Sequence, residues 1–133
     1  KVVERFSGSA RLARSIAQHG IDCEAWDIID GPEADLLKLR NRKPLLREKR
    51  RGRFVFIWMA FPCTSWPMAR RLTRSGPGPL RDGAGGLWGL PGLSERDQFK
   101  VDLANRLLRM TASIAKECIR LRIPFVLENP KSS

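Results

Sequence analysis

The sequence has few of the residues on which many catalytic and metal sites depend. It contains one histidine, His19, and three cysteines, none of which belongs to a Cys-x-x-Cys pair. We therefore expect no metal, no histidine-based catalysis and no paired-cysteine redox site. Sparse, unpaired cysteines are typical of a reducing environment, which predicts an intracellular location.

Long hydrophobic stretches are also missing. No apolar run approaches the ~20 residues that a membrane-spanning helix needs, and no charged-then-apolar leader precedes the first predicted strand. We expect no membrane partner. The chain starts at Lys1 without an initiator methionine and stops at "ENPKSS", directly after a predicted strand. Its 133 residues are enough for one domain, so we expect residues 1–133 to be part of one domain that is incomplete at its C-terminus.

Acidic residues are scarce relative to basic ones. Against 25 Lys and Arg there are 14 Asp and Glu, which gives a net charge of +11. Such an excess favours a polyanionic partner, and we expect nucleic acid, with DNA preferred and the nucleus as one candidate location. The residues expected to contact phosphates are Arg47, Lys49, Arg50, Arg51, Arg70 and Arg71. For any one of them, a solvated helix face is an equally good interpretation.

Apolar segments alternate with segments of helical period along the chain. Strands are expected at 1–6, 21–29, 53–61 and 123–130, and helices at 7–20 and 94–122. A basic segment, 33–43, is expected to be helical or irregular and to break at Pro44, and a glycine- and proline-rich loop is expected at 74–93. This alternation predicts an α/β fold with an open, mostly parallel sheet, in which 53–61 is central because it is continuously apolar.

Four residues fall at predicted strand ends: Gly8, Asp27, Cys63 and Glu128. In open parallel sheets, ligands bind outside the carboxyl ends of the strands, near the point where the strand order reverses. We therefore expect one crevice to gather these four residues.

Cys63 is the strongest candidate for chemistry. In "IWMAFPCTSWP", an apolar strand runs directly into Phe-Pro-Cys, and Pro62 ends the strand just before the thiol. A cysteine is more often a small buried apolar residue, but that interpretation fits Cys23 and Cys118 better, because both lie inside regular elements. A helical turn after Cys63 would lower the pKa of its thiol.

Three motifs, "ERFSG", "FPC" and "LEN", follow one another along the chain at strand ends. In this order the chain resembles the cytosine carbon-5 DNA methyltransferases. The resemblance implies a Rossmann-like sheet with helices on both faces, and S-adenosylmethionine as cofactor. In that family a Phe-x-Gly turn holds the cofactor, a Pro-Cys supplies the nucleophile, and a Glu-Asn pair follows on a neighbouring strand.

The resemblance assigns cofactor contacts to five residues of this chain. They are Phe6, Gly8, Asp27, Asp35 and Phe61. Gly8 lets the backbone approach the cofactor, Asp27 accepts hydrogen bonds from the ribose hydroxyls, and Asp35 receives the adenine amino group.

Alternatives stay open for some of these positions. Glu24 competes with Asp27 for the ribose, and Asp35 is more simply an aspartate at the start of a helix. Ala10 stands where the family usually has a second glycine. For Gly8 alone, an ordinary strand-to-helix turn explains the motif as well.

The resemblance assigns catalysis to Cys63 and Glu128. The Cys63 thiolate adds to carbon 6 of cytosine, which makes carbon 5 nucleophilic enough to take the methyl group. Glu128, protonated, donates to ring nitrogen 3, and its place after the apolar "PFVL" favours the protonated form by desolvation. The simpler alternative is a strand-end glutamate paired with an arginine. Asn129 matches the usual Asn, whereas Thr64 stands where the family has glutamine.

Two further functions compete with DNA methyl transfer. One is a methyltransferase-like domain without activity, a nucleic-acid-binding module of a mobile element, since "LWGLPGL" and "LENPKSS" resemble segments of such polyproteins. The other is an RNA cytosine methyltransferase, because phosphate contacts do not distinguish RNA from DNA.

Overall fold

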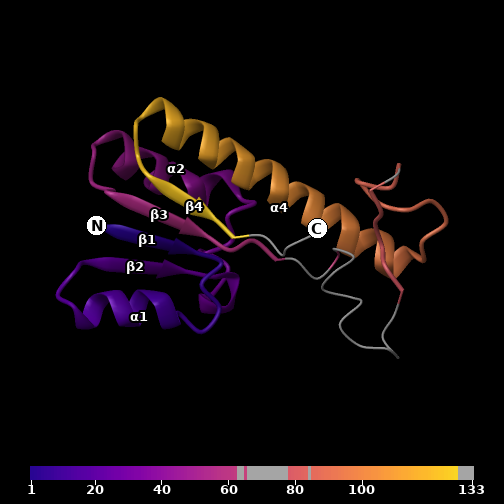
Figure 1. Ribbon diagram of the computed structural model, residues 1–133, viewed down its shortest axis with the longest axis horizontal. Coiled ribbons are helices and arrows are strands. Elements are labelled where there is room, and N and C mark those ends of the chain that lie inside the picture. Colours follow the sequence, from indigo (N-terminus) through magenta and orange to yellow (C-terminus); the bar gives the residue numbers. More distant parts are fainter. Residues whose placement is uncertain (63–64, 66–77, 84, 129–133) are drawn as a thin grey trace. The chain divides into compact units, whose positions relative to one another are not determined.

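The computed structural model describes residues 1–62, 65, 78–83 and 85–128 (Figure 1). They divide into two compact units, one made of Lys1–Phe61 with Met110–Glu128 and the other lying within Pro62–Arg109. The first unit carries all the strands of the described residues. The second carries the glycine-rich loop and the first turns of the long helix.

A parallel sheet forms the centre of the first unit. Its strands are β1 (Val2–Arg5), β2 (Cys23–Trp26), β3 (Phe56–Met59) and β4 (Phe125–Leu127). The strand order is β2-β1-β3-β4, and every neighbouring pair is parallel. The predicted α/β class is confirmed, and so is the central place of the third strand, which lies between β1 and β4.

Helix α1 (Arg11–Gln18) follows β1 and begins without a side-chain cap of its own, because Ala10 occupies the capping position. Glu4, a buried residue of β1, supplies the missing acceptor: its Oε2 accepts a hydrogen bond of 2.8 Å from the backbone N–H of Ala13. A carboxylate at a helix N-terminus also interacts favourably with the helix dipole. The strand therefore fixes where the helix starts.

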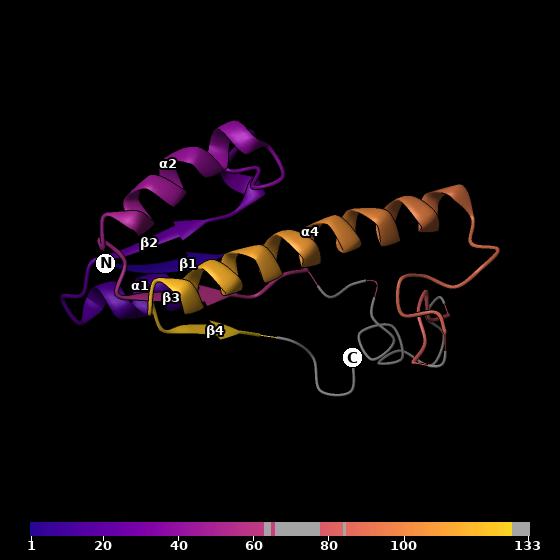
Figure 2. The same cartoon turned by 90° about the horizontal axis from the view of Figure 1, so that it is seen from above.

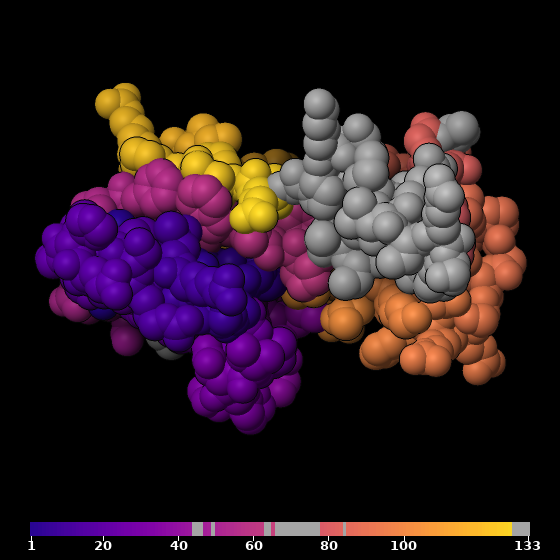
Figure 3. Space-filling view, turned by 60° about the horizontal axis from the view of Figure 1, so that its bottom comes forward, coloured from indigo at the N-terminus to yellow at the C-terminus, as the bar shows by residue number. Residues whose placement is uncertain are grey.

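The segment between β2 and β3 differs from the prediction. A short 3₁₀ helix, η1 (Ile28–Asp30), follows β2, and Figure 3 shows this purple part of the chain projecting from the first unit. Helix α2 (Leu39–Arg50) then runs through Pro44, so the prediction of a break at this proline is wrong. A proline inside a helix removes one backbone hydrogen bond but does not forbid the turns on either side.

Helices cover both faces of the sheet in the first unit. Figures 1 and 2 together show α1 on one face, and α2 with the later turns of α4 (Glu95–Arg120) on the other. The face opposite α1 carries the side chains of Val3, Arg5, Ile57 and Met59, which the register aligns and which are all buried.

Burial is unequal between strands and along the long helix. Phe56 and Trp58, on the other face of β3, are half-buried, so the expected burial of this strand is complete on one face only. Met110, Ile114 and Cys118 recur at four-residue spacing on α4 and are buried, so they form the apolar face of its later turns.

In the second unit, the described residues between 78 and 93 have no regular secondary structure, as predicted, but a few of them are buried. Leu80 is buried, and its carbonyl accepts a hydrogen bond of 2.9 Å from the Leu90 N–H. Ser94 then caps α4, because its Oγ accepts from the Asp97 N–H at 3.2 Å. The described part of the loop is therefore closed by a backbone hydrogen bond and leads into a capped helix start.

No helix among the described residues is long and apolar enough to cross a membrane. Within the same residues, no group of three or more His, Cys, Asp and Glu side chains is arranged to hold a metal ion.

Candidate functional site

The carboxyl ends of the four strands meet at one edge of the sheet. Backbone hydrogen bonds continue just past each strand: the Phe6 N–H donates to Trp26 O at 2.9 Å, Ala60 to Arg5 at 3.2 Å, and Glu128 to Met59 at 2.8 Å. All four strands are parallel, but from β1 the chain first crosses to β2 on one side and then returns past β1 to β3 and β4 on the other. The strand order therefore reverses between β1 and β3. This is the position where open α/β sheets hold ligands.

Gly8 and Asp27 are brought together at this edge. The backbone N–H of Gly8 donates to Asp27 Oδ2 at 2.8 Å, and the other carboxylate oxygen accepts from the Ile29 N–H at 3.1 Å. Each carboxylate oxygen retains a further lone pair. A Cβ placed on Gly8 would meet no atom within 4 Å, so there is open space beside this glycine.

The turn between β1 and α1 has an unusual backbone. Phe6, Gly8 and Ala10 have φ angles of 58°, 51° and 52°, in the left-handed region that disfavours side chains. Ala10, which stands where the resembled motif has a glycine, thus has a backbone conformation that glycine adopts without strain. The turn keeps its shape at the cost of strain at two residues other than glycine.

The structure separates Asp27 from its competitor Glu24. The Glu24 carboxylate accepts hydrogen bonds from Trp26 Nε1 and from Lys1 Nζ, the latter at 3.2 Å. Burial alone would raise the pKa of Glu24, but these two hydrogen bonds together with the positive charges of Lys1 and Arg5 outweigh burial and leave the pKa below its ordinary value. Glu24 is therefore engaged within the sheet, whereas Asp27 lies at its edge.

Asp35 takes part in the turn that leads into α2. Its Oδ1 accepts from the Leu37 N–H at 2.9 Å, and Oδ2 lies 3.7 Å from Lys38 Nζ. Its backbone carbonyl accepts from Asn41 Nδ2 at 2.9 Å. These contacts are those of an aspartate at a helix start, the alternative interpretation of this residue.

Arg5 is a charged residue that the sequence reasoning missed. It is 1% exposed, its guanidinium lies 4.5 Å from the centre of the Trp26 ring, and its two terminal nitrogens have no hydrogen-bond partner among the described residues. Burial lowers its pKa to about 9. The hydrophobic periodicity of β1 gave no signal for a buried cation, because an arginine at a strand end is ordinarily exposed.

The proposed catalytic residues are described only in part. Cys63 and Asn129 lie outside the described residues. Glu128 follows β4, and Trp58 Nε1 donates to its Oε2 at 3.3 Å. Glu128 is exposed, so the desolvation expected at this strand end is not seen. Phe61, which precedes Pro-Cys, is buried.

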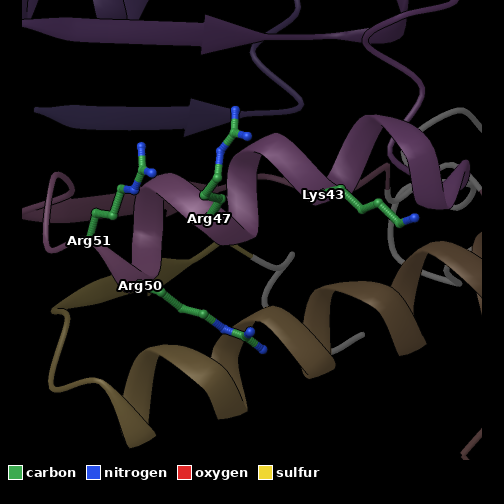
Figure 4. A pocket seen from close by; sticks show the side chains of 4 residues that line it. All are labelled: Lys43, Arg47, Arg50 and Arg51. Atoms are coloured by element: carbon green, nitrogen blue, oxygen red, sulfur yellow. The ribbon is translucent and has the colours of Figure 1, made fainter.

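A cationic pocket lies on α2. Its volume is about 380 Å³, and it is lined by Lys43, Arg47, Arg50 and Arg51. Figure 4 shows Arg47 and Arg51 pointing away from α4 and Arg50 pointing toward it. Three of these residues were named individually as phosphate contacts; Lys43, one helical turn before Arg47, belongs to the same basic run, Lys38 to Arg53, which was expected to hold phosphates.

Ion pairs engage only part of this pocket. Arg50 Nε lies 3.6 Å from Glu117 Oε1, and Arg51 Nη1 lies 3.6 Å from Glu48 Oε1. Lys43 and Arg47 make no ion pair with the described residues. The side chain of Lys49 and the whole of Arg70 and Arg71 lie outside the described residues.

Comparison with known proteins adds no assignment: no protein-family model, curated protein or solved structure matches this chain.

Proposed function

We propose that this chain is part of a cytosine carbon-5 methyltransferase that uses S-adenosylmethionine and acts on DNA. The observation that carries the proposal is the hydrogen bond between Gly8, which follows β1, and Asp27, which follows β2. It lies beside the reversal of strand order between β1 and β3, near which such a cofactor binds in Rossmann-like sheets. The order β2-β1-β3-β4 also suits a doubly wound sheet. An intracellular, DNA-containing compartment belongs to the same proposal.

The residues at this edge fit the cofactor. The open space beside Gly8 lets a ligand approach the backbone, and Asp27 retains acceptor capacity for two ribose hydroxyls. Phe6 directly follows β1, at the start of the turn, and Phe61 lies two residues after the end of β3. When bound, S-adenosylmethionine supplies an activated methyl group.

The protein's own residues then act on the base. The Cys63 thiolate forms a bond to carbon 6 of cytosine, carbon 5 takes the methyl group, and loss of the carbon-5 proton with the sulfur–carbon bond restores the ring. Glu128 holds a proton at ring nitrogen 3 while the thiolate adds. The target base must leave the duplex stack for this chemistry, because carbons 5 and 6 face neighbouring bases within it.

A second candidate is a methyltransferase-like nucleic-acid-binding module without activity, or one that acts on RNA. The cationic pocket on α2 favours binding of nucleic acid as such, and Ala10 and Thr64 depart from the enzymes' motif. Phosphate contacts bind DNA and RNA alike.

Cofactor binding separates methyl transfer, to DNA or to RNA, from the binding module without activity, and it provides the first prediction. We expect isothermal calorimetry to detect S-adenosylmethionine binding, and Gly8→Ala to weaken it by at least about tenfold because the added methyl group occupies the open space, a loss of about 1.4 kcal/mol. Asp27→Ala should weaken binding as well.

The control for this prediction is Gly20→Ala. Gly20, at the other end of α1, has a φ of 74° and equally open surroundings, so both substitutions strain the backbone alike. Gly20→Ala should leave cofactor affinity unchanged. Equal losses in both variants, or no binding to the unmodified chain, would leave the binding module as the better account.

A further inference from the structure

In the second unit, Trp88 presents a large aromatic surface to solvent. Trp88 is 50% exposed. The guanidinium of Arg109 lies over the Trp88 ring, 4.9 Å from the ring centre. Burying a tryptophan is strongly favourable, so a tryptophan left half exposed forgoes part of that stabilisation.

The backbone on which Trp88 stands is held from below by a buried polar network. Arg81, which is 1% exposed, donates from Nη1 to Leu87 O at 2.7 Å and to Asn105 Oδ1 at 2.8 Å. Asn105 in turn donates from Nδ2 to Trp88 O at 2.9 Å. The backbone carbonyls of Leu87 and Trp88 are therefore both held by hydrogen bonds.

Two further contacts of Arg81 tie the network to the rest of the unit. Its Nε donates to Ser65 Oγ at 3.1 Å, and its Nη2 donates to Val101 O at 3.3 Å. Burying a guanidinium costs free energy unless its hydrogen bonds are made, so this arrangement fixes the loop in one geometry.

The loop also approaches α4 very closely just after Trp88. A Cβ added to Gly89, whose φ is 128°, would lie 2.8 Å from Cγ1 of Val101. On α4 itself, Asn105 and Arg109 are four residues apart and thus share one face of the helix. One residue of this face holds the backbone of Trp88, and the other covers its ring.

We propose that Trp88 and Arg109 form a stacking platform for an unpaired base of single-stranded nucleic acid. Arg109 lies over the indole, and in this proposal a base stacks on the exposed part of the ring. The Arg109 cation lies where it attracts the adjoining phosphate, and Arg106, one turn earlier and exposed, adds to this attraction. Rigid aromatic surfaces beside cations are the means by which proteins bind single strands without sequence preference.

This inference goes beyond the proposed methyl transfer, because none of these residues belongs to the catalytic or cofactor assignments. The two proposals share only their partner, nucleic acid. A protein without methyltransferase activity would use the same platform.

Fluorescence anisotropy with a labelled oligothymidylate tests the platform, using the whole 133-residue chain at one fixed salt concentration. Trp88→Ala should weaken binding about 5- to 150-fold, the range found when one base-stacking aromatic is removed. Trp88→Phe, which retains an aromatic ring, should lose less than Trp88→Ala. Arg109→Met should weaken binding and reduce the salt dependence by about one counterion.

The matched control is Phe99→Ala, which removes another aromatic ring of the same unit that is 69% exposed. It should change affinity less than about twofold, since no ring stacking is lost. A blunt duplex, whose bases are covered, should show little response to Trp88→Ala. Equal losses for Phe99→Ala and Trp88→Ala, or unchanged single-strand affinity in Trp88→Ala, would overturn the proposal.

The outcomes distinguish this platform from the proposed methyl transfer. Loss of single-strand binding in Trp88→Ala with intact S-adenosylmethionine binding supports the platform independently of catalysis. Absence of cofactor binding in a chain whose single-strand binding still depends on Trp88 would overturn the methyltransferase proposal and leave the platform in place.

Discussion

Backbone strain in the turn after β1 is concentrated at residues that carry side chains. Phe6 and Ala10 both have left-handed φ angles, although glycine is the residue that adopts them without strain. The Phe-x-Gly pattern predicted a turn at this place, but a backbone conformation at an alanine leaves no mark in the sequence. The hydrogen bond from Glu4 to the start of α1 was equally hidden, because it joins residues of two different elements.

At Ala10, replacing alanine by glycine should stabilise the protein. The left-handed conformation costs a residue with a Cβ about 1–2 kcal/mol, and the greater flexibility of glycine offsets about 0.5–1 kcal/mol of the relief. We expect Ala10→Gly to raise the free energy of unfolding by about 0.5–1 kcal/mol in urea denaturation.

Ala17→Gly serves as the control within the same helix. Ala17 is exposed and helical, so its replacement should lower the free energy of unfolding by about 0.5–1 kcal/mol. If Ala10→Gly destabilised the chain as much as Ala17→Gly does, the left-handed backbone at residue 10 would be contradicted.

Among the elements, α2 combines a proline with a dense set of cations. The sequence correctly predicted its basic composition but not its continuous helix through Pro44. A proline removes one backbone hydrogen bond of a helix, and the sequence does not reveal that the turns on both sides form nevertheless. The helix places Lys43 and Arg47 one turn apart, and neither makes an ion pair with the described residues.

The loop between 78 and 93 illustrates a different limit. Its lack of regular structure followed from its glycines and prolines. The contacts of Arg81 with Asn105 did not, since polar contacts between a loop and a distant helix have no periodicity to detect.

Lys43 and Arg47, which make no ion pair with the described residues, should contribute to the salt dependence of nucleic-acid binding. Each phosphate contact that is removed lowers the slope of log K against log salt by about one. We expect the double variant Lys43→Ala/Arg47→Ala to flatten the slope by about two, measured with a DNA duplex between low and moderate salt.

An equal loss of charge elsewhere provides the comparison. Arg11 and Arg14 lie exposed on α1, which covers the opposite face of the sheet, and Arg11→Ala/Arg14→Ala should leave the slope nearly unchanged. The same flattening in both double variants would mean that net charge alone governs binding, and the pocket on α2 would lose its assigned role.

At the scale of the whole molecule, alternating strands and helices predicted the α/β class, and the parallel sheet confirms it. The reversal of strand order between β1 and β3 could not be read from alternation, because several orders satisfy the same sequence of elements. The position of Gly8 and Asp27 at predicted strand ends led to the expectation that they lie together, and their hydrogen bond shows that they do. The proposed methyl transfer assigns the nucleophile to Cys63, and an experiment on its thiol tests that assignment.

Covalent trapping on DNA that contains 5-fluorocytosine is that experiment. Fluorine at carbon 5 blocks the elimination that frees the enzyme, so with S-adenosylmethionine present a nucleophilic Cys63 should remain attached to the DNA. Protein of natural length should form an adduct that resists denaturation and is seen on a denaturing gel. Cys63→Ser should abolish the adduct, whereas Cys23→Ser and Cys118→Ser should retain it. A folded protein that binds both cofactor and DNA and forms no adduct, or an adduct that persists in Cys63→Ser, would contradict the assignment of Cys63 as the nucleophile.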